Sequence, residues 1–492
     1  WWILSTLYKK GYLYQSVSIQ PYSPAAGTGL SSHELNQPGT YKDVKDTSTV
    51  AMFKAVENAD SQFLFDAVNA ASVKSKEIFY MAWTTTPWTL PSNLGLTVGP
   101  NIEYVLVATY NPYTAIPVNV LLAKNLVSKY FKEEGEGLES FAEGDKIIPW
   151  KIIATCKGSG LNGLRYEQLM PFEANDPKTF EGDPFKIVLG DFVTTEDGTG
   201  IVHTSPAFGA DDYKVGQKNN LGIITLVDRE GKFVEGVGEF SGRYVKNYKD
   251  EKDYQDVNVD ISVKLKKENR AFKVEKYEHN YPHCWRTDKP ILYYPLDAWF
   301  IKTTAVKDRL IELNKTINWK PKSTGEGRFG NWLENMVDWN LSRSRYWGTP
   351  LPIWRTEDGT EEVCIGSIEE LTKGFLAAKE KGLNKAVDLK IIDGKLDVDL
   401  HKPFVDQIEL VSASGQAMKR VSDLVDVWFD SGAMPYAQWH YPFENKDLID
   451  KGQAFPADFI CEGVDQTRGW FYTLHTLGVL LFDSVAYKAV MS

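Results

Sequence analysis

Short apolar runs separated by turn residues fill much of the first half of the chain. The runs EIFYMAWTTT, EYVLVATY, FKIVLGDFV and GIVHTS are rich in β-branched and aromatic residues, with Gly, Pro and Asn between them. This pattern predicts strands joined by turns, and hence a β-rich domain from Glu77 to about Val274. Ahead of it we predict an amphipathic helix at the start of the chain and an extended arm over Pro21–Thr40, a stretch rich in Gly, Pro and Ser.

A different pattern occupies the end of the chain. The segments SDLVDVWFDSG and PADFICEGVDQTRGWFYTLHTLGVLLF each place an apolar strand before a polar turn and a helix. This alternation predicts a parallel α/β sheet, in which ligands bind at the carboxyl ends of strands. The charged stretch Glu357–Lys402 is expected to be a surface insertion with one helix near Ile368–Glu380. Helical spacing at the first residue and a strand-like pattern at Tyr487–Ser492 favour an internal segment of a longer protein.

Composition excludes several classes of protein. Of the 492 residues, 43% are apolar and 25% are charged, which is ordinary globular usage. The net charge of -11 provides no overall positive field, so any contact with nucleic acid must come from local patches. The longest apolar stretch, Leu477–Phe482, is far shorter than the roughly 20 residues of a membrane-spanning helix. The four cysteines form no CxxC pair, which favours a reducing cytoplasm over a disulfide framework or a four-cysteine zinc site.

Two polar clusters in the β-rich domain are candidates for chemistry. Three threonines, Thr84–Thr86, end a strand shortly before Asn93, and several hydroxyls in one place can bind a polar substrate or orient a water. In the run GIVHTSPAFGADDY, His203 ends a strand and Asp212 opens the next helix. Spacing alone leaves two other interpretations open, namely an edge strand with β-favourable threonines and a buried histidine beside a helix cap.

A third candidate is the turn GVDQTRGWF, which follows the predicted strand DFICE. Glu462 stands at the strand tip, and Gly463 lets the backbone approach a ligand. Asp465 and Gln466 then supply polar groups suited to the hydroxyls of a ribose. A charged turn between a strand and a helix is the alternative explanation.

Five motifs in a fixed order carry a family resemblance. TTTPWTLPSN, HTSPAFGADD, LSRSRYWGTPLPIW, DVWFDSG and EGVDQTRGWF together resemble the class I aminoacyl-tRNA synthetases, and within that class the isoleucyl family. The valyl and leucyl families usually have an arginine after the paired threonines, where this chain has Thr86. Agreement among several independent motifs is more specific than any single one.

The resemblance implies an α/β fold: an incomplete Rossmann-like nucleotide-binding fold of class I synthetase type, with a large inserted β-rich editing domain. The division implied for the chain is 1–50, the end of the first Rossmann half and a former zinc arm; 51–275, the editing insertion; 276–355, the return into the catalytic domain; 356–420, a surface insertion; and 421–492, the truncated second Rossmann half.

The resemblance also implies a hydrolytic second sieve. Isoleucine and valine differ by one methylene, worth about 1–3 kcal/mol in a hydrophobic pocket, and the isoleucyl enzymes are the well-known example of this difference. By family analogy, Asp212 binds the ammonium of the mischarged valine and His203 narrows the pocket against isoleucine. The side chains expected around the ester and the attacking water are Thr84, Thr85, Thr86 and Asn93.

In the synthetic fold the family pattern implies a second set of residues. Around the aminoacyl-adenylate it places Glu462, Gly463, Asp465 and Gln466, with Trp428 and Trp470 beside the isoleucine side chain. The expected partners are ATP, with Mg²⁺ in the full-length enzyme, isoleucine tRNA, isoleucine and valine, for a monomer that binds no membrane. The His-Ile-Gly-His and Lys-Met-Ser-Lys-Ser motifs of the class are absent, so we do not expect this segment to form adenylate unaided.

The chain departs from its family at the zinc-binding arm. Many members have two cysteines in a Pro-Tyr-Cys-Pro-x-x-Cys-Gly-Thr run and two in a His-Cys-Trp-Arg-Cys run, whereas this chain has PYSPAAGTG and HCWRTD. Ser23, Ala26 and Thr287 stand at cysteine positions, and Cys284 alone is kept. Tetrahedral zinc needs four ligands, or three and a water, so we predict an arm without metal. A substitute site built from His33 and His283 is the less favoured alternative.

Three rival functions remain to be weighed. A valyl or leucyl synthetase would share the class and differ in the substrate. A non-catalytic scaffold that binds nucleotide or RNA would keep the fold without the activity. A carbohydrate-active enzyme, suggested by 15 tryptophans and abundant carboxylates, would need two opposed carboxylates beside stacking tryptophans.

Overall fold

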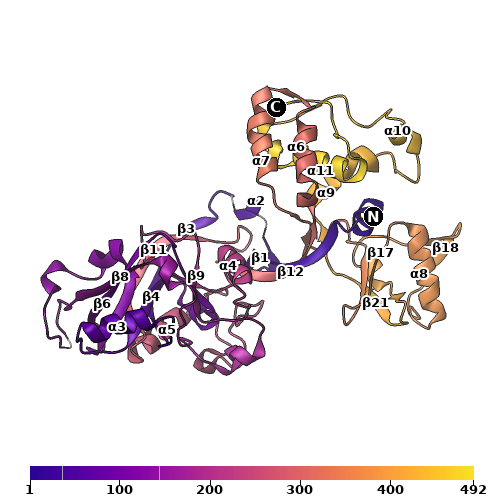
Figure 1. Ribbon diagram of the computed structural model, residues 1–492. Coiled ribbons are helices and arrows are strands. Elements are labelled where there is room, and N and C mark those ends of the chain that lie inside the picture. The colour runs from indigo at the N-terminus through magenta and orange to yellow at the C-terminus, as the bar shows by residue number, and fades with distance from the viewer. Residues whose placement is uncertain (31, 36, 143) are drawn as a thin grey trace. The chain divides into compact units, whose positions relative to one another are not determined.

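The computed structural model describes residues 1–30, 32–35, 37–142 and 144–492, without the side chains of residues 32 and 33, and it divides the chain into two compact units (Figure 1). Unit 1 consists of Trp1–Val17 and Asp297–Ser492, and unit 2 consists of Ser18–Leu296. The boundaries fall within two strands, β1 (Leu13–Ser23) and β12 (Leu292–Ile301). The finer division into five parts stays a prediction.

Unit 2 is built around a nine-stranded mixed sheet. Its main path runs in the order β8-β6-β7-β4-β10-β5-β9, and β3 joins it by pairing with β4 and β11. Pairings of β4 with β7 and β10, and of β5 with β9, are parallel, while the others are antiparallel. The strands are β3 (Tyr41–Lys54), β4 (Ile78–Thr84), β5 (Gly95–Val98), β6 (Glu103–Tyr110), β7 (Pro117–Ala123), β8 (Lys151–Lys157), β9 (Lys186–Leu189), β10 (Ile201–Thr204) and β11 (Ala271–Pro282).

The sheet begins earlier than the sequence pattern predicted. Strand β3 already starts at Tyr41, ahead of the expected start at Glu77, and pairs with β11 along nearly its whole length. Its first residues, YKDVKD, alternate between exposed and half-buried positions and are strongly charged. Charged residues are depleted in strands, so the sequence of this segment did not predict a strand. The long antiparallel pairing with β11 stabilises the extended structure instead.

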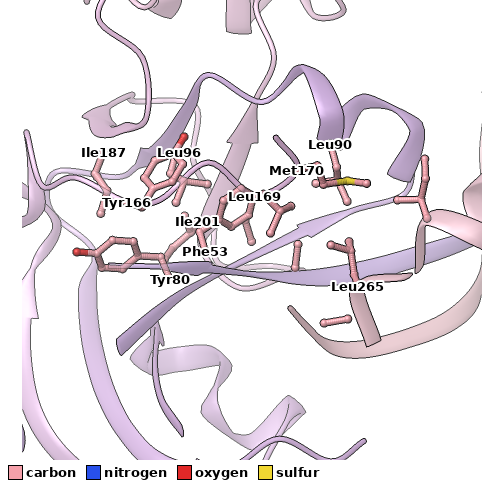
Figure 2. Packing of buried hydrophobic residues seen from close by; sticks show 14 of the residues in the cluster. Phe53, Tyr80, Leu90, Leu96, Tyr166, Leu169, Met170, Ile187, Ile201 and Leu265 are labelled. Atoms are coloured by element: carbon pink, nitrogen blue, oxygen red, sulfur yellow. The ribbon is translucent and has the colours of Figure 1, made fainter. Parts of the chain in front are cut away.

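Three helices accompany this sheet, α3 (Gln62–Ala70), α4 (Ala210–Lys218) and α5 (Val257–Lys267). Helix α5 packs against β3 and β11, and it buries Ile261 and Leu265. The core of the unit includes Phe53, Tyr80 and Tyr166, which Figure 2 shows among aliphatic neighbours. Removal of this apolar surface from water is the main force that holds the unit together.

The predicted arm has more internal structure than an extended segment. It contains the end of β1, the short strand β2 (Thr28–Gly29), and helix α2 (Ser32–Leu35). Tyr22 belongs to the main core of unit 2, while Leu30 and Leu35 pack with Cys284 and Ile291 in a small cluster of their own. The Gly, Pro and Ser residues marked the turns correctly, but the apolar residues between them anchor the arm.

Unit 1 mixes helices with several small sheets. Its helices are α1 (Trp2–Lys9), α6 (Lys307–Asn314), α7 (Gly330–Glu334), α8 (Ile368–Glu380), α9 (Val427–Ala437), α10 (Lys446–Asp450) and α11 (Trp470–Phe482). Its strands outside β1 and β12 are β13 (Asn318–Lys320), β14 (Trp339–Asn340), β15 (Ser342–Arg343), β16 (Ile353–Thr356), β17 (Glu362–Cys364), β18 (Lys390–Ile392), β19 (Lys395–Asp397), β20 (Leu410–Val411), β21 (Ala417–Arg420), β22 (Leu424–Val425), β23 (Ile460–Cys461) and β24 (Ala489–Met491). The helix predicted at Ile368–Glu380 is confirmed.

A parallel βαβ crossover forms the nucleotide-fold part of unit 1. Strand β23 leads through a turn into α11, which returns the chain to β24, and β24 pairs in parallel with both β23 and β13. Helix α11 is buried along most of its length because it is apolar on nearly all sides. The crossover places Glu462–Gln466 directly after the carboxyl end of β23, where the sequence predicted a ligand turn. Across the described ranges, every helix is too short or too polar to cross a membrane.

Candidate functional site

The threonine segment connects β4 to a 3-10 helix, η1 (Pro87–Ser92). The strand ends at Thr84, and proline begins the helix because its fixed φ suits the first helical position. The hydroxyl of Thr84 accepts a hydrogen bond from the backbone N–H of Thr86 at 3.0 Å and lies 3.3 Å from the Thr86 hydroxyl. Thr85 and Thr86 are half-buried, so this turn gathers hydroxyls beside the protein surface.

His203 lies at the centre of a buried hydrogen-bonded network. Its Nε2 is 3.0 Å from the Thr89 hydroxyl, and its Nδ1 is 2.8 Å from the amide nitrogen of Asn93. The amide oxygen of Asn93 accepts a hydrogen bond from the hydroxyl of Tyr166 at 2.7 Å. Burial lowers the pKa of His203 to about 4, so the imidazole is neutral at physiological pH.

The network continues from His203 to the threonine turn. The Thr89 hydroxyl donates to the backbone carbonyl of Thr86 at 2.8 Å and lies 3.4 Å from the Thr86 hydroxyl. Four of the predicted site residues, Thr84, Thr86, Asn93 and His203, are thus joined through one chain of contacts.

Asp212 is held close to the same segments by a different route. Its carboxylate accepts a hydrogen bond from the backbone N–H of Ser205 at 2.8 Å, and the Ser205 hydroxyl donates to the carbonyl of Ser92. The residue lies in the first turn of α4, whose N-cap is Gly209, so the alternative interpretation of Asp212 as the helix cap is wrong. Burial raises the pKa of Asp212 to about 6, although the Ser205 N–H opposes the rise. A half-buried carboxylate that ionises near neutral pH is suited to bind a cation.

Thr89 and Tyr166 were not among the residues selected from the sequence. Thr89 belongs to the recognised motif TTTPWTLPSN but was overlooked as a partner of His203. Tyr166 lies 73 positions from its partner Asn93, and no motif surrounds it. Its sequence neighbours Arg165 and Glu167 are charged, so the sequence contains no sign that this tyrosine is buried and needs a hydrogen-bond partner.

The turn after β23 brings the second set of residues together in unit 1. Glu462, Gly463 and Asp465 are exposed, and Gln466 is half-buried. The Gln466 side-chain oxygen accepts a hydrogen bond from the backbone N–H of Trp470 at 2.9 Å, which ties the turn to the start of α11. Its amide nitrogen is 3.1 Å from the carboxylate of Asp465.

Two tryptophans flank this turn from neighbouring helices. The Trp470 indole donates to the carbonyl of Ser431 in α9 at 3.1 Å, so α9 and α11 are locked together beside the turn. Trp428 is 41% exposed, and a Cβ added at Gly469 would come within 3.2 Å of its ring. The same Cβ would lie 2.6 Å from the side-chain oxygen of Gln466, so a larger residue at this position would require Gln466 and Trp428 to shift. The indole of Trp428 keeps an exposed apolar face beside the polar groups.

The residues at the former cysteine positions do not fit a zinc site. Ser23 accepts a hydrogen bond from the backbone N–H of Ala26 at 3.2 Å, which closes the turn that metal would otherwise hold. Cys284 is buried in the small apolar cluster of the arm, and Thr287 lies in the turn that follows it. Within the described ranges no three His, Cys, Asp or Glu side chains form a group suited to a metal, and the His33 side chain lies outside the described residues. A metal-free arm stays a prediction.

Comparison with known proteins defines the class. Residues 1–492 match the family described as tRNA synthetases class I (I, L, M and V), and the chain belongs to this family.

Within the class, the chain is similar to isoleucine--tRNA ligases of several bacteria. The chain is 58% identical over 517 residues to the isoleucine--tRNA ligase of Cytophaga hutchinsonii, covering 100% of this chain and 44% of that protein. It is 53% identical over 532 residues to the isoleucine--tRNA ligase of Bacteroides fragilis, covering 100% of this chain and 45% of the relative. The chain thus spans less than half the length of these relatives.

Solved structures give a remote likeness. A leucyl-tRNA synthetase editing domain from P. knowlesi matches 47% of this chain and 97% of its own with a TM-score of 0.32 and 13% identity. A crystal structure titled GlLeuRS-CP1 matches 47% of this chain and 100% of its own with a TM-score of 0.34 and 14% identity. These scores are too low to carry an argument about function.

Proposed function

We propose that this chain is the part of an isoleucine-tRNA ligase that holds a hydrolytic editing site together with one portion of the site for isoleucyl-adenylate. The observation that carries the proposal is the hydrogen-bonded network that joins His203 to the threonine turn, with Asp212 held by the backbone N–H of Ser205, two positions after His203. The name shared by relatives that match the whole chain supports isoleucine over valine or leucine as the cognate amino acid.

In the proposed editing reaction, Asp212 binds the ammonium group of valine attached to isoleucine tRNA. A charge-assisted hydrogen bond to an ionised carboxylate is about twice as strong as a neutral one, and it fixes the amino acid relative to the threonine turn. The oxygen of a water attacks the ester carbonyl carbon, the bond to the ribose oxygen breaks, and that oxygen takes a proton. The hydroxyls of Thr84, Thr85 and Thr86 orient the water and the ester, because orientation provides much of the rate in such a reaction.

His203 acts in this scheme as a wall against the larger amino acid. Both ring nitrogens are engaged by Asn93 and Thr89, so the ring is held firmly while its carbon edge is available to limit the pocket. Excluding isoleucine requires a steric barrier, since polar groups do not distinguish two aliphatic side chains.

For the synthetic reaction we propose that the exposed turn Glu462–Gln466 binds the ribose and phosphate portion of the adenylate, with Trp428 and Trp470 against the isoleucine side chain. ATP is the proposed substrate. The described residues contain no group of three His, Cys, Asp or Glu side chains that could hold Mg²⁺. A cytoplasmic monomer is the proposed state, in keeping with the cysteines Cys156, Cys284, Cys364 and Cys461, none of which forms a disulfide in the described structure.

The test compares two neighbouring aspartates of α4. Asp212→Ala is expected to reduce hydrolysis of valylated isoleucine tRNA by at least about 100-fold, because the ammonium loses its ionic partner and the ester loses its position. Asp211→Ala is the matched control, since Asp211 is exposed and pairs with Lys214 at 3.1 Å on the helix surface. Hydrolysis rates and melting curves of both variants would be measured beside the unmodified chain.

Undiminished hydrolysis by Asp212→Ala, with an unchanged melting curve, would contradict the proposed editing site. If the unmodified chain binds tRNA but hydrolyses no ester, the rival reading of a non-catalytic scaffold gains support. Cleavage of oligosaccharides in a parallel assay would instead favour the carbohydrate-active alternative.

A further inference from the structure

The groups around His203 define which of its ring nitrogens carries the proton. The amide nitrogen of Asn93 donates to the backbone carbonyl of Gly95 at 2.8 Å, and a carbonyl can only accept, so this atom is identified as the NH₂ group. The other end of the amide accepts a hydrogen bond from the Tyr166 hydroxyl at 2.7 Å. The amide orientation is therefore fixed from both ends.

The same NH₂ group lies 2.8 Å from His203 Nδ1, which must then accept with its lone pair. A neutral imidazole that accepts at Nδ1 carries its proton on Nε2. That N–H donates to the Thr89 hydroxyl at 3.0 Å, and the hydroxyl in turn donates a hydrogen bond to the Thr86 carbonyl at 2.8 Å. Donors and acceptors thus alternate along the whole chain from Tyr166 to the threonine turn.

From this alternation we infer that Tyr166 is a positioning residue, which through Asn93 holds His203 as the Nε2–H tautomer and so sets the direction of the hydroxyls at the threonine turn. Its effect on hydrolysis rests on the proposed editing function, whereas the tautomer is a property of the folded chain alone.

Tyr166 is well suited to act as a permanent donor. Its side chain is 3% exposed, and its ring packs edge-on against Phe53 at 5.3 Å and against Phe185 at 6.1 Å, within the cluster shown in Figure 2. Burial raises the pKa of Tyr166 well above its ordinary value, so the hydroxyl stays protonated. A rigid donor in a buried region keeps the amide of Asn93 from rotating.

The opposite tautomer would disturb the threonine turn. With the proton on Nδ1, the lone pair on Nε2 would require the Thr89 hydroxyl as a donor, and the Thr86 carbonyl would keep only the backbone N–H of Thr89 at 2.9 Å. The Nδ1–H would also face the NH₂ group of Asn93 at 2.8 Å, so two donors would meet there and the network would rearrange. Both ring nitrogens of His203 are already engaged in hydrogen bonds, so the imidazole is unable to accept a proton from the attacking water. His203 therefore limits the shape of the pocket and orders the threonine turn.

The experiment uses the complete 492-residue chain labelled with ¹⁵N at its seven histidines. Ring nitrogen shifts separate protonated from unprotonated nitrogens, and His203→Gln identifies the signals of His203. We expect a protonated Nε2 in the unmodified chain and a mixture of tautomers in Tyr166→Phe. The kcat for valyl-tRNA hydrolysis in this variant should fall about tenfold with KM unchanged, because positioning is lost while ammonium binding stays.

Tyr104→Phe is the matched control. Tyr104 lies fully buried in the same core cluster, and its hydroxyl bonds only backbone groups, the carbonyl of Gly200 at 2.6 Å and the N–H of Gly99 at 3.1 Å. This variant should lose stability to a similar extent and keep the Nε2–H tautomer with an unchanged kcat.

A second variant covers the case in which Tyr166→Phe does not fold. Asn93→Asp replaces the donor at Nδ1 by an acceptor, so the proton is expected on Nδ1. An unchanged Nε2–H tautomer in both variants, or a tautomer shift in Tyr104→Phe as well, would overturn the inference. A shift confined to Tyr166→Phe and Asn93→Asp supports it, and if no variant or parent chain hydrolyses valyl-tRNA, the editing proposal alone has failed.

Discussion

The two candidate sites are built in opposite ways. Around His203, buried side chains satisfy one another, and Asn93 is 3% exposed with its amide engaged at both ends. After β23, Glu462 and Asp465 are exposed, and Gln466 ties the turn to the helix behind it. A closed network keeps its shape without a ligand, whereas an exposed polar turn keeps its groups available for one. A site that rejects a substrate by size needs the first design, and a site that binds a nucleotide is served by the second.

The largest expected contrast comes from removing one amide in each region. Asn93→Ala should lower the free energy of unfolding by about 2–4 kcal/mol, because Tyr166, His203 and Gly95 all lose a buried partner. Gln466→Ala removes the bond to the first N–H of α11 together with an exposed contact to Asp465, and should cost about 0.5–1.5 kcal/mol. Urea unfolding of both variants measures the difference, and equal losses would contradict the contrast.

Truncation of the wall probes what the closed network is for. His203→Ala should allow isoleucyl-tRNA to be hydrolysed, raising that rate about 10–200-fold, the range expected for recognition of one methylene. Hydrolysis of valyl-tRNA should change much less. Thr89→Val serves as a control, because it removes the hydroxyl partner of Nε2 and leaves the ring in place. If His203→Ala still spares isoleucyl-tRNA, the histidine is not the barrier.

A smaller effect is expected from the charge of Asp212. Its pKa is raised from 3.8 to about 6, so the folded chain holds this proton more tightly than the unfolded chain. The resulting stabilisation is complete below about pH 4 and is lost as the pH rises to about 6. Asp212→Asn should therefore match the parent chain at pH 4 and be more stable by about 1–2 kcal/mol at pH 7.5. Urea unfolding at both values tests this, and a difference independent of pH would contradict it.

No effect is expected from removing metal ions. Treatment with a chelator should leave the melting temperature unchanged and elemental analysis should find no stoichiometric zinc, because the arm is closed by Ser23 and packed around Cys284. Cys284→Ala should lower stability equally with and without chelator. One zinc per chain, lost together with stability in Cys284→Ala, would show that other ligands replace the missing cysteines.

The sequence predicted elements where a local pattern was strong. Ile368–Glu380 forms the expected helix, since Ser367 caps it and apolar residues recur on one face. Strand β10 and helix α4 flank the His203 loop as expected. Strand β3 was missed because its pairing with β11 is distant in sequence, and a charged strand has little intrinsic preference for extended structure.

The same division applies to the site residues. The residues around His203 and those in the turn after β23 were found from the sequence because each group lies in short local motifs. Their roles came from the family resemblance and stay proposals. Tyr166 was missed because its role depends on a contact across 73 positions of the chain. The pKa values of His203 and Asp212 were equally out of reach, since both depend on how deeply the fold buries them.

The interrupted course of unit 1 has a consequence for synthesis on the ribosome. Unit 2 is continuous in sequence, so all of it is synthesised before the segment from Asp297 onward. The segment Trp1–Val17 is therefore unable to pack in unit 1 while Ser18–Leu296 folds. Until the later segment is made, its apolar residues Leu4 and Leu7 lack their neighbours in the core of unit 1. When unit 2 folds first, the two ends of Ser18–Leu296 are held at defined positions. The loss of conformational entropy when the two segments of unit 1 later pair is therefore smaller than it would be with a flexible connection.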